Sequence, residues 1–177
     1  MGRQRHFNKV NLFTGIIFNE RIDPAGLILE LESQFSRADH VSEIFDFNFT
    51  DYYNSEMGES LSRRFISFSD LISPEELPGI KILTNEIEIK YAVSGKRTVN
   101  LDPGYISDAN VIIATTKNYY QRVPLTDGIY AQMEYVIKGK SLHALEWTYP
   151  DFRTDKYMNF FQDMLGLYKK KVAACRV

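Results

Sequence analysis

The sequence predicts an α+β domain: a β-α-β start, then an antiparallel meander of about four strands, and a C-terminal helix. The spacing of apolar residues indicates this class. Before Gly95 they recur mostly at helical spacing, and after it they alternate as in strands. Residues 1–177 contain no repeat or linker, and 44% of them are hydrophobic, enough for one core. We therefore expect a single domain with the helices packed mainly on one side of the sheet.

In the N-terminal part, residues 9–18 are rich in β-branched and aromatic side chains and are typical of a buried strand. Asp23 and Pro24 then suit an N-cap followed by the first helical position, so a helix is expected to run to about Arg37. A strand is expected over 41–50, where three aromatic residues alternate with polar ones: Phe45, Phe47 and Phe49.

A second helix is expected to begin near Gly58, because four apolar residues follow at helical spacing: Leu61, Phe65, Phe68 and Ile72. Ser73 to Glu76 matches a capping box and predicts a short helical turn. Residues 79–92 fit a helix or a strand, and their length favours a helix. Residues 86–90 spell E-x-E-x-K and so resemble a strand of triphosphate-tunnel enzymes. In a helix these two glutamates share no face, which favours coincidence.

After Gly95 five segments alternate as strands do: 97–101, 111–117, 122–125, 128–138 and 141–147. Short connections between them predict sequential antiparallel pairing, with 117–122 joining two paired strands. In 128–138, Gln132, Glu134 and Lys138 are expected to face solvent. Residues 155–171 suit a helix, with an acidic start and a basic end that complement its dipole.

Composition excludes several function classes. The net charge of −2 provides no overall positive field, which argues against a nucleic-acid partner. A single cysteine, Cys175, excludes an internal disulfide and a cysteine-based zinc site, and the three histidines have no metal-ligand spacing. No apolar run suits a membrane helix, and no signal peptide follows the basic start at Met1 to His6. We expect a cytoplasmic protein; its cofactor and oligomeric state stay open.

Three short segments carry chemistry, and each has a structural alternative. Residues 100–105 suit either a type II turn around Pro103 and Gly104 or a strand end that presents polar groups to a site. Residues 115–122 contain two hydroxyls, an ammonium and a guanidinium, which suit a phosphate or carboxylate, or else are solvated at a sheet edge. Residues 147–153 suit either an apolar plug over the sheet or a contact surface.

Taken in order, these segments resemble a bacterial family of unknown function, the DUF4416 domain, over nearly the whole chain. The resemblance rests on residues 49–53, 56–58, 80–81, 84–88, 99–105, 114–117, 128–131 and 147–151, together with Leu61, Arg63 or Arg64, and Arg122. The family has no activity to carry over. Its pattern has His where this chain has Gln121, which puts catalysis through that position in doubt. The pattern is dense in polar residues, and this favours a ligand site.

The leading hypothesis is a domain that binds an anionic small molecule or nucleotide-like ligand bearing a phosphate or a carboxylate; whether it is an enzyme stays open. The expected ligand-binding residues are Lys117, Arg122, Thr115, Thr116, Asn100, Tyr130 and Arg64. The expected acids, bases or metal carboxylates are Asp102, Glu56 and Glu88. The alternative is a non-catalytic protein-interaction domain that uses the aromatic residues at 147–152 and exposed tyrosines.

Overall fold

A computed structural model describes Arg3 and residues 6–175. Its strands are β1 Val10–Asn19, β2 Ala38–Val41, β3 Phe45–Phe47, β4 Leu61–Ile72, β5 Val99–Ile106, β6 Asn110–Thr115, β7 Val123–Pro124, β8 Tyr130–Lys138 and β9 Ser141–Ala144. Its helices are α1 Pro24–Gln34, α2 Asn54–Met57, α3 Leu77–Lys90 and α4 Asp155–Ala174, with the short 3-10 turns η1 Pro74–Glu76 and η2 Asp151–Arg153. The expected α+β class and the C-terminal helix are confirmed.

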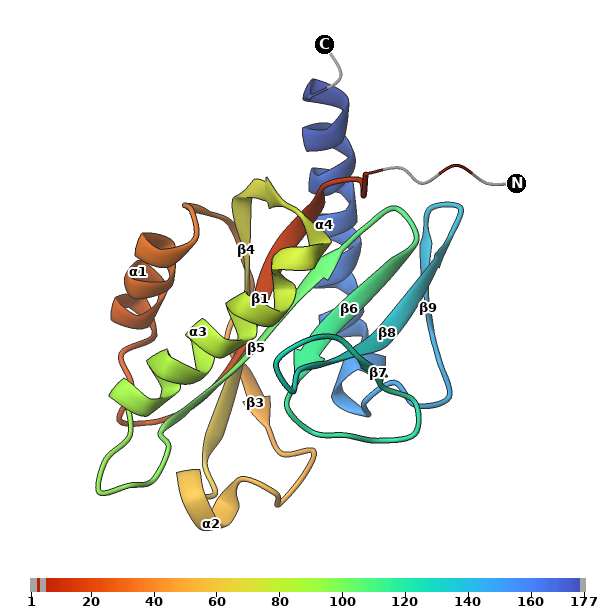
Figure 1. Cartoon of the computed structure of the whole chain (residues 1–177). Coiled ribbons are helices and arrows are strands. Elements are labelled where there is room, and N and C mark those ends of the chain that lie inside the picture. Colours follow the sequence, from red (N-terminus) through yellow and green to blue (C-terminus); the bar gives the residue numbers. More distant parts are fainter. Residues whose placement is uncertain (1–2, 4–5, 176–177) are drawn as a thin grey trace.

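The nine described strands form one antiparallel sheet in the order β2-β4-β1-β5-β6-β8-β7 (Figure 1). The other two of these nine strands lie off this path, where β3 pairs with β4 and β9 pairs with β8. The sheet is therefore larger than the four-stranded meander that the sequence predicts. The expected pairing across 117–122 is wrong, because β8 lies between β6 and β7 and pairs with both.

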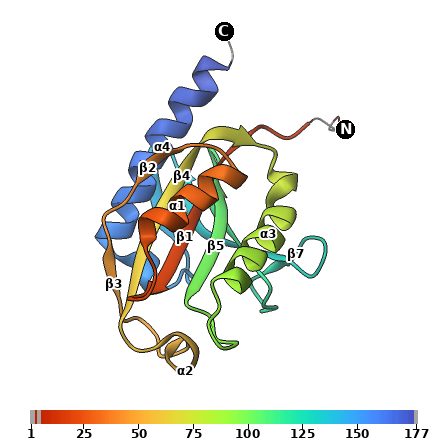
Figure 2. The same cartoon turned by 90° about the vertical axis from the view of Figure 1, so that its left-hand side faces the viewer.

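Helices cover both faces of the sheet, which corrects the expectation of helices mainly on one side. Figures 1 and 2 show α1 and α3 on one face and α4 on the other. The α1/α3 face holds an apolar cluster that includes Leu12, Ile16, Leu27 and Leu31. The α4 face holds a second cluster, rich in aromatic rings, that includes Phe161. Because β1 contributes to both clusters, it is buried along its whole length.

The expected helix near Gly58 is wrong. Residues 61–72 form β4, preceded only by the four-residue α2. Phe65 packs in the α4-side cluster, whereas Ile66 and Phe68 pack in the α1/α3-side cluster. A strand that is buried on both faces has apolar residues on both sides, so its spacing also fits a helix. The expected strand over 41–50 is split into β2 and β3, with Phe45 and Phe47 buried as predicted.

Strand β8 differs from the prediction in the direction of its polar residues. Gln132 and Glu134 are fully buried instead of facing solvent. The register shifts between the pairs Ile112–Met133 and Val111–Tyr135, so Glu134 is an extra residue in a bulge. A bulge reverses the alternation along a strand. Met133 therefore packs with the β6 residues Ile112 and Ala114, and Tyr135 packs in the α4-side cluster.

Strand β5 runs straight through Pro103 and Gly104, so the type II turn that suits this segment is absent. Strand β6 pairs with β5 only from Gly104 to Ile106, and the earlier half of β5 diverges from β6. Gly104 allows the close approach at this point, because an added Cβ would lie 2.2 Å from the carbonyl oxygen of Ile112. The sheet thus opens into a fork between β5 and the end of β6.

Several local predictions are confirmed. The side chain of Asp23 accepts hydrogen bonds from the backbone amides of Ala25 and Gly26 at the start of α1. The capping box at Ser73 and Glu76 is present. Residues 77–90 are helical, so the E-x-E-x-K segment is not a strand. Within the described residues, no helix has the length and apolarity to cross a membrane. Met1, Gly2, Gln4 and Arg5, on which the absence of a signal peptide partly rests, lie outside the described residues.

Candidate functional site

The fork between β5 and β6 opens into a cavity of about 640 Å³, which we call the fork pocket. Its volume lies in the range of small-molecule sites. Strands β5 and β6, helix α3, the β3–α2 segment and the segment before α4 contribute its walls. The charged side chains that line it are Arg63, Lys81, Arg97, Lys117, Arg122, Glu88, Asp102 and Asp151.

A buried ion pair forms the floor of the fork pocket. Arg63 of β4 lies across β1 and donates to Asp102 of β5 at 3.0 Å. Gly15 of β1 leaves room for this path, because an added Cβ would lie 2.6 Å from the Arg63 guanidinium. Three aromatic rings surround the guanidinium, with that of Phe65 nearest at 4.7 Å. Asp102 is thereby held with its carboxylate partly exposed toward the cavity.

The open edge of β5 is covered by charged residues of α3. The Lys81 ammonium donates to the Leu101 carbonyl at 2.6 Å, and the Leu101 amide donates to the Glu88 carboxylate at 2.7 Å. Both side chains are buried, and burial raises the pKa of Glu88 above its ordinary value. These contacts satisfy the backbone groups that a neighbouring strand would otherwise pair. Because the backbone groups of Leu101 are already paired, no further strand can add to β5 at this residue, and the fork remains accessible to a ligand.

Arg97 connects the fork pocket to Glu56 on α2. Its guanidinium donates to both carboxylate oxygens of Glu56, at 2.7 and 2.9 Å, and to Glu88 and the Asn100 side-chain oxygen. The hydrogen bond from Arg97 holds the pKa of Glu56 below its ordinary value. Because the Asn100 oxygen faces a donor, its amide nitrogen faces away, and this buried nitrogen has no partner among the described residues.

Two cations at one wall differ in how they are held. The Lys117 ammonium is exposed and lies 3.7 Å from the centre of the Tyr52 ring. The Arg122 guanidinium is half-buried and donates to Gln132, to the Tyr149 hydroxyl and to the Lys117 carbonyl. In the described part of the chain, neither cation has a carboxylate within 4.0 Å. Their positive charge is therefore available to a ligand.

Large aromatic and aliphatic side chains form much of the remaining lining. They are Ile17, Phe47, Phe49, Tyr52, Tyr53, Ile113, Tyr119, Tyr149 and Phe152. Burial raises the pKa of Tyr53, so its hydroxyl keeps its proton and can donate a hydrogen bond. Burial also raises the pKa of Asp151 despite the nearby Arg63 guanidinium. A ligand here would contact cations at one wall and aromatic surface beside them.

Of the ten residues proposed from sequence, the structure brings seven together in the fork pocket: Asp102, Glu88, Asn100, Thr115, Thr116, Lys117 and Arg122. Glu56 does not line the pocket itself, but it accepts a hydrogen bond from Arg97, which does. Tyr130 does not line the pocket, and Arg64 turns away from it to donate to the Ser42 carbonyl. Strand alternation explains the direction of the Arg64 side chain. Successive residues of a strand point to opposite faces, and its neighbour Arg63 points to the α4 side. Sequence reasoning missed Arg97, Lys81 and the tyrosines as site residues, although Lys81, Tyr52, Tyr53 and Tyr149 lie in the segments that carry the family resemblance.

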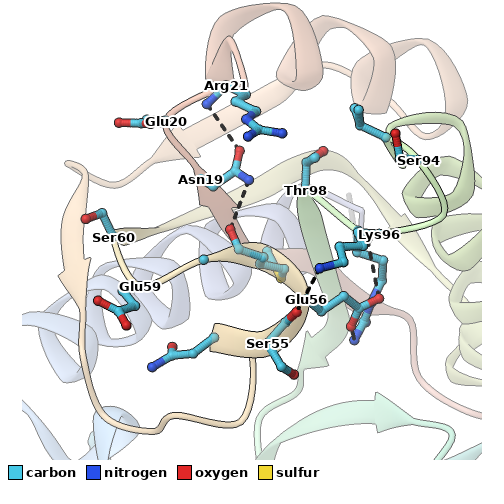
Figure 3. A pocket seen from close by; sticks show the side chains of 15 residues that line it. Asn19, Glu20, Arg21, Ser55, Glu56, Glu59, Ser60, Ser94, Lys96 and Thr98 are labelled. Carbon is cyan, nitrogen blue, oxygen red and sulfur yellow. Dashed lines mark hydrogen bonds and ion pairs between the residues drawn. The ribbon is translucent and has the colours of Figure 1, made fainter.

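A second cavity, of about 510 Å³, lies on the other side of Glu56 and Arg97 (Figure 3). Part of its polar lining bonds to nearby protein groups. Asn19 donates to the Met57 carbonyl and accepts from the Arg21 amide, and Lys96 reaches the Ser55 carbonyl. The fork pocket is the stronger candidate for a ligand site, because it combines cations that have no carboxylate within 4.0 Å, among the described residues, with an aromatic lining.

Fold and site together define a class: an antiparallel α+β domain with a cation-lined pocket where its sheet divides. The family model for the domain of unknown function DUF4416 matches residues 8–168, so the chain belongs to this family. Comparisons with curated proteins and with solved structures give no match.

Proposed function

We propose that this protein binds a small organic anion in the fork pocket, with the phosphate or carboxylate at Lys117 and Arg122. The observation that carries the proposal is the absence of a carboxylate within 4.0 Å of either cation, in the described residues, at the wall of a cavity of ligand size. Such charges favour an incoming anion, because arginine and lysine form charge-assisted hydrogen bonds with phosphate and carboxylate.

The rest of the ligand is expected to carry a ring or another apolar group. Tyr52, Tyr119 and Phe49 are exposed large side chains beside the cations, and each of them lines the cavity. Aromatic side chains at a ligand site favour stacking with planar groups. A nucleotide-like anion and a simple aromatic phosphate both meet these requirements.

The protein-interaction alternative has weaker support. Of the segment 147–152, Thr148, Asp151 and Phe152 are buried, and the Trp147 indole donates to the Met133 carbonyl. This segment therefore packs on the sheet as a plug and offers little surface to a partner. Arg153 takes part in the same packing by donating to three backbone carbonyls.

The test uses phenyl phosphate, with inorganic phosphate and phenol as the two half-ligands, measured by titration calorimetry. Phenyl phosphate is expected to bind more tightly than either half. Lys117→Ala is expected to weaken it about tenfold, the effect of losing one charge-assisted hydrogen bond. Lys140→Ala removes the same charge from the exposed β8–β9 turn and is the matched control.

Equal weakening by both variants would indicate a general charge effect and contradict the site. Failure of every probe to bind the unmodified protein would contradict the proposed function itself. Arg122→Lys keeps the charge but loses the guanidinium geometry, and it is expected to weaken phenyl phosphate binding as well.

A further inference from the structure

Arg122 is held by a chain of buried hydrogen bonds that begins at Glu134, a residue that does not line the fork pocket. Glu134 accepts from the side-chain nitrogen of Gln132 at 2.5 Å. The side-chain oxygen of Gln132 then accepts from the Nε of Arg122 at 2.7 Å. These hydrogen bonds lie behind the pocket wall, because Gln132 and Glu134 are fully buried.

The carboxylate of Glu134 determines which end of the Gln132 amide faces Arg122. A carboxylate only accepts hydrogen bonds, so it selects the amide nitrogen of Gln132 and turns the oxygen toward the guanidinium. The same carboxylate accepts from the Tyr149 backbone amide at 3.1 Å. Tyr149 in turn accepts from Arg122 through its hydroxyl, at 2.6 Å. Glu134 thus acts on Arg122 through two separate paths.

Arg122 retains donors for a ligand in this arrangement. A guanidinium has five N–H groups, and the three hydrogen bonds that Arg122 donates use one N–H on each nitrogen. One N–H therefore remains on each terminal nitrogen. The Tyr149 hydroxyl accepts from Arg122, so its own proton is also free to donate.

We propose that Glu134 is a positioning residue, which acts through Gln132 and Tyr149 to hold Arg122 in the orientation that receives the anion. This inference rests on the proposed function, since it concerns the same cation. Its role in the free protein can nevertheless be tested without any ligand. This role also accounts for two features of β8, namely the bulge at Glu134 and the burial of the polar residues Gln132 and Glu134.

The variant that tests this is Glu134→Gln, which has nearly the same shape. Gln132 and the Tyr149 amide donate to different oxygens of Glu134, and a glutamine side chain has an NH₂ donor in place of one of these oxygens, so one of the two contacts loses its acceptor. If its nitrogen faces Gln132, the Gln132 amide must turn and present donors to Arg122. Gln132→Met breaks the same chain one residue nearer to Arg122 and serves if Glu134→Gln does not fold.

The first measurement follows the arginine Nε–H resonances by ¹⁵N NMR without ligand, at pH 8. The pH is chosen because burial raises the pKa of Glu134 to about 7, with Arg122 and Asp151 as the nearby charges. The Arg122 signal is expected to shift and to exchange faster with water in the variant. Arg153, whose Nε donates to the Thr148 carbonyl, is the internal control and should not change. An unchanged Arg122 signal overturns the proposal.

The second measurement is phenyl phosphate affinity in two backgrounds. Glu134→Gln is expected to weaken binding about fivefold when Arg122 is present, as for the loss of one neutral hydrogen bond. In Arg122→Lys it should change binding less than about twofold, because the residue through which it acts is gone. An equal loss in both backgrounds would indicate a general structural role and overturn the inference. Unmodified protein that binds no probe contradicts the proposed function alone, and the NMR result still decides the role of Glu134.

Discussion

The two faces of the sheet bury different kinds of side chain. The α1/α3 face is closed by aliphatic side chains such as Ile16, Leu27 and Leu31, all fully buried. The α4 face carries aromatic rings as well, but near the fork it also buries Arg63, Gln132, Glu134 and Asp151. Burying charged and polar groups costs free energy unless they are paired. The α1/α3 face also buries charge beside the fork, at Lys81 and Glu88. The contrast is therefore between the aliphatic contact of α1 with the sheet, which mainly stabilises the fold, and the region around the fork, which accepts a cost in stability in order to present a polar site.

The largest expected effect is on the aliphatic face. Leu31→Ala removes a fully buried side chain from the contact between α1 and the sheet. It is expected to lower the free energy of unfolding by about 2–5 kcal/mol, from lost burial and the cavity left behind. Urea unfolding followed by the fluorescence of Trp147, the single tryptophan, measures it. Phenyl phosphate affinity should be unchanged, and a parallel loss of affinity would contradict the separation of the α1 contact from the fork region.

A smaller, pH-dependent effect is expected from Glu134 on the polar face. Burial raises its pKa to about 7, whereas an unfolded glutamate titrates near its ordinary value of about 4.3. Between these values the native state binds more protons, so the contribution of Glu134 to stability falls as pH rises. The difference in free energy of unfolding between the unmodified protein and Glu134→Gln should decrease by about 3 kcal/mol from pH 4.5 to pH 8.

Urea unfolding at several pH values measures this difference. Burial also raises the pKa of Asp151 and Glu88, but both groups are present in both proteins, so their effects cancel to first order. A difference that does not depend on pH would mean that Glu134 titrates as it does in the unfolded chain.

The smallest effect on stability is expected from Tyr149→Phe. This change removes only the hydroxyl that accepts from Arg122 and leaves the ring in place. The free energy of unfolding should fall by about 1 kcal/mol, the net value of one hydrogen bond. Phenyl phosphate binding should weaken as well, because Arg122 loses one of its supports. If Tyr149→Phe lowers the free energy of unfolding but leaves phenyl phosphate affinity unchanged, the Tyr149 hydroxyl does not support ligand binding by Arg122.

The candidate site could be predicted in part because its polar residues lie in short segments with clear chemistry. The segment from Thr115 to Lys117 and the strand residues Asn100 and Asp102 do line one pocket, although the expected hairpin between 111–117 and 122–125 does not exist. Arg97 and Lys81 could not be found this way. Their partners, Glu56 and the Leu101 carbonyl, are 41 and 20 residues away in the chain.

Local signals by themselves determined the fold class, the helix starts at Asp23 and Ser73 and the C-terminal helix, because caps and periodicity act over a few residues. Only the tertiary structure decided that residues 61–72 form a strand, since helices on both faces of the sheet make apolar spacing uninformative there. It also decided the burial of Glu134. A bulge and the packing of the segment before α4 turn this residue inward, and neither can be read from the alternation of β8.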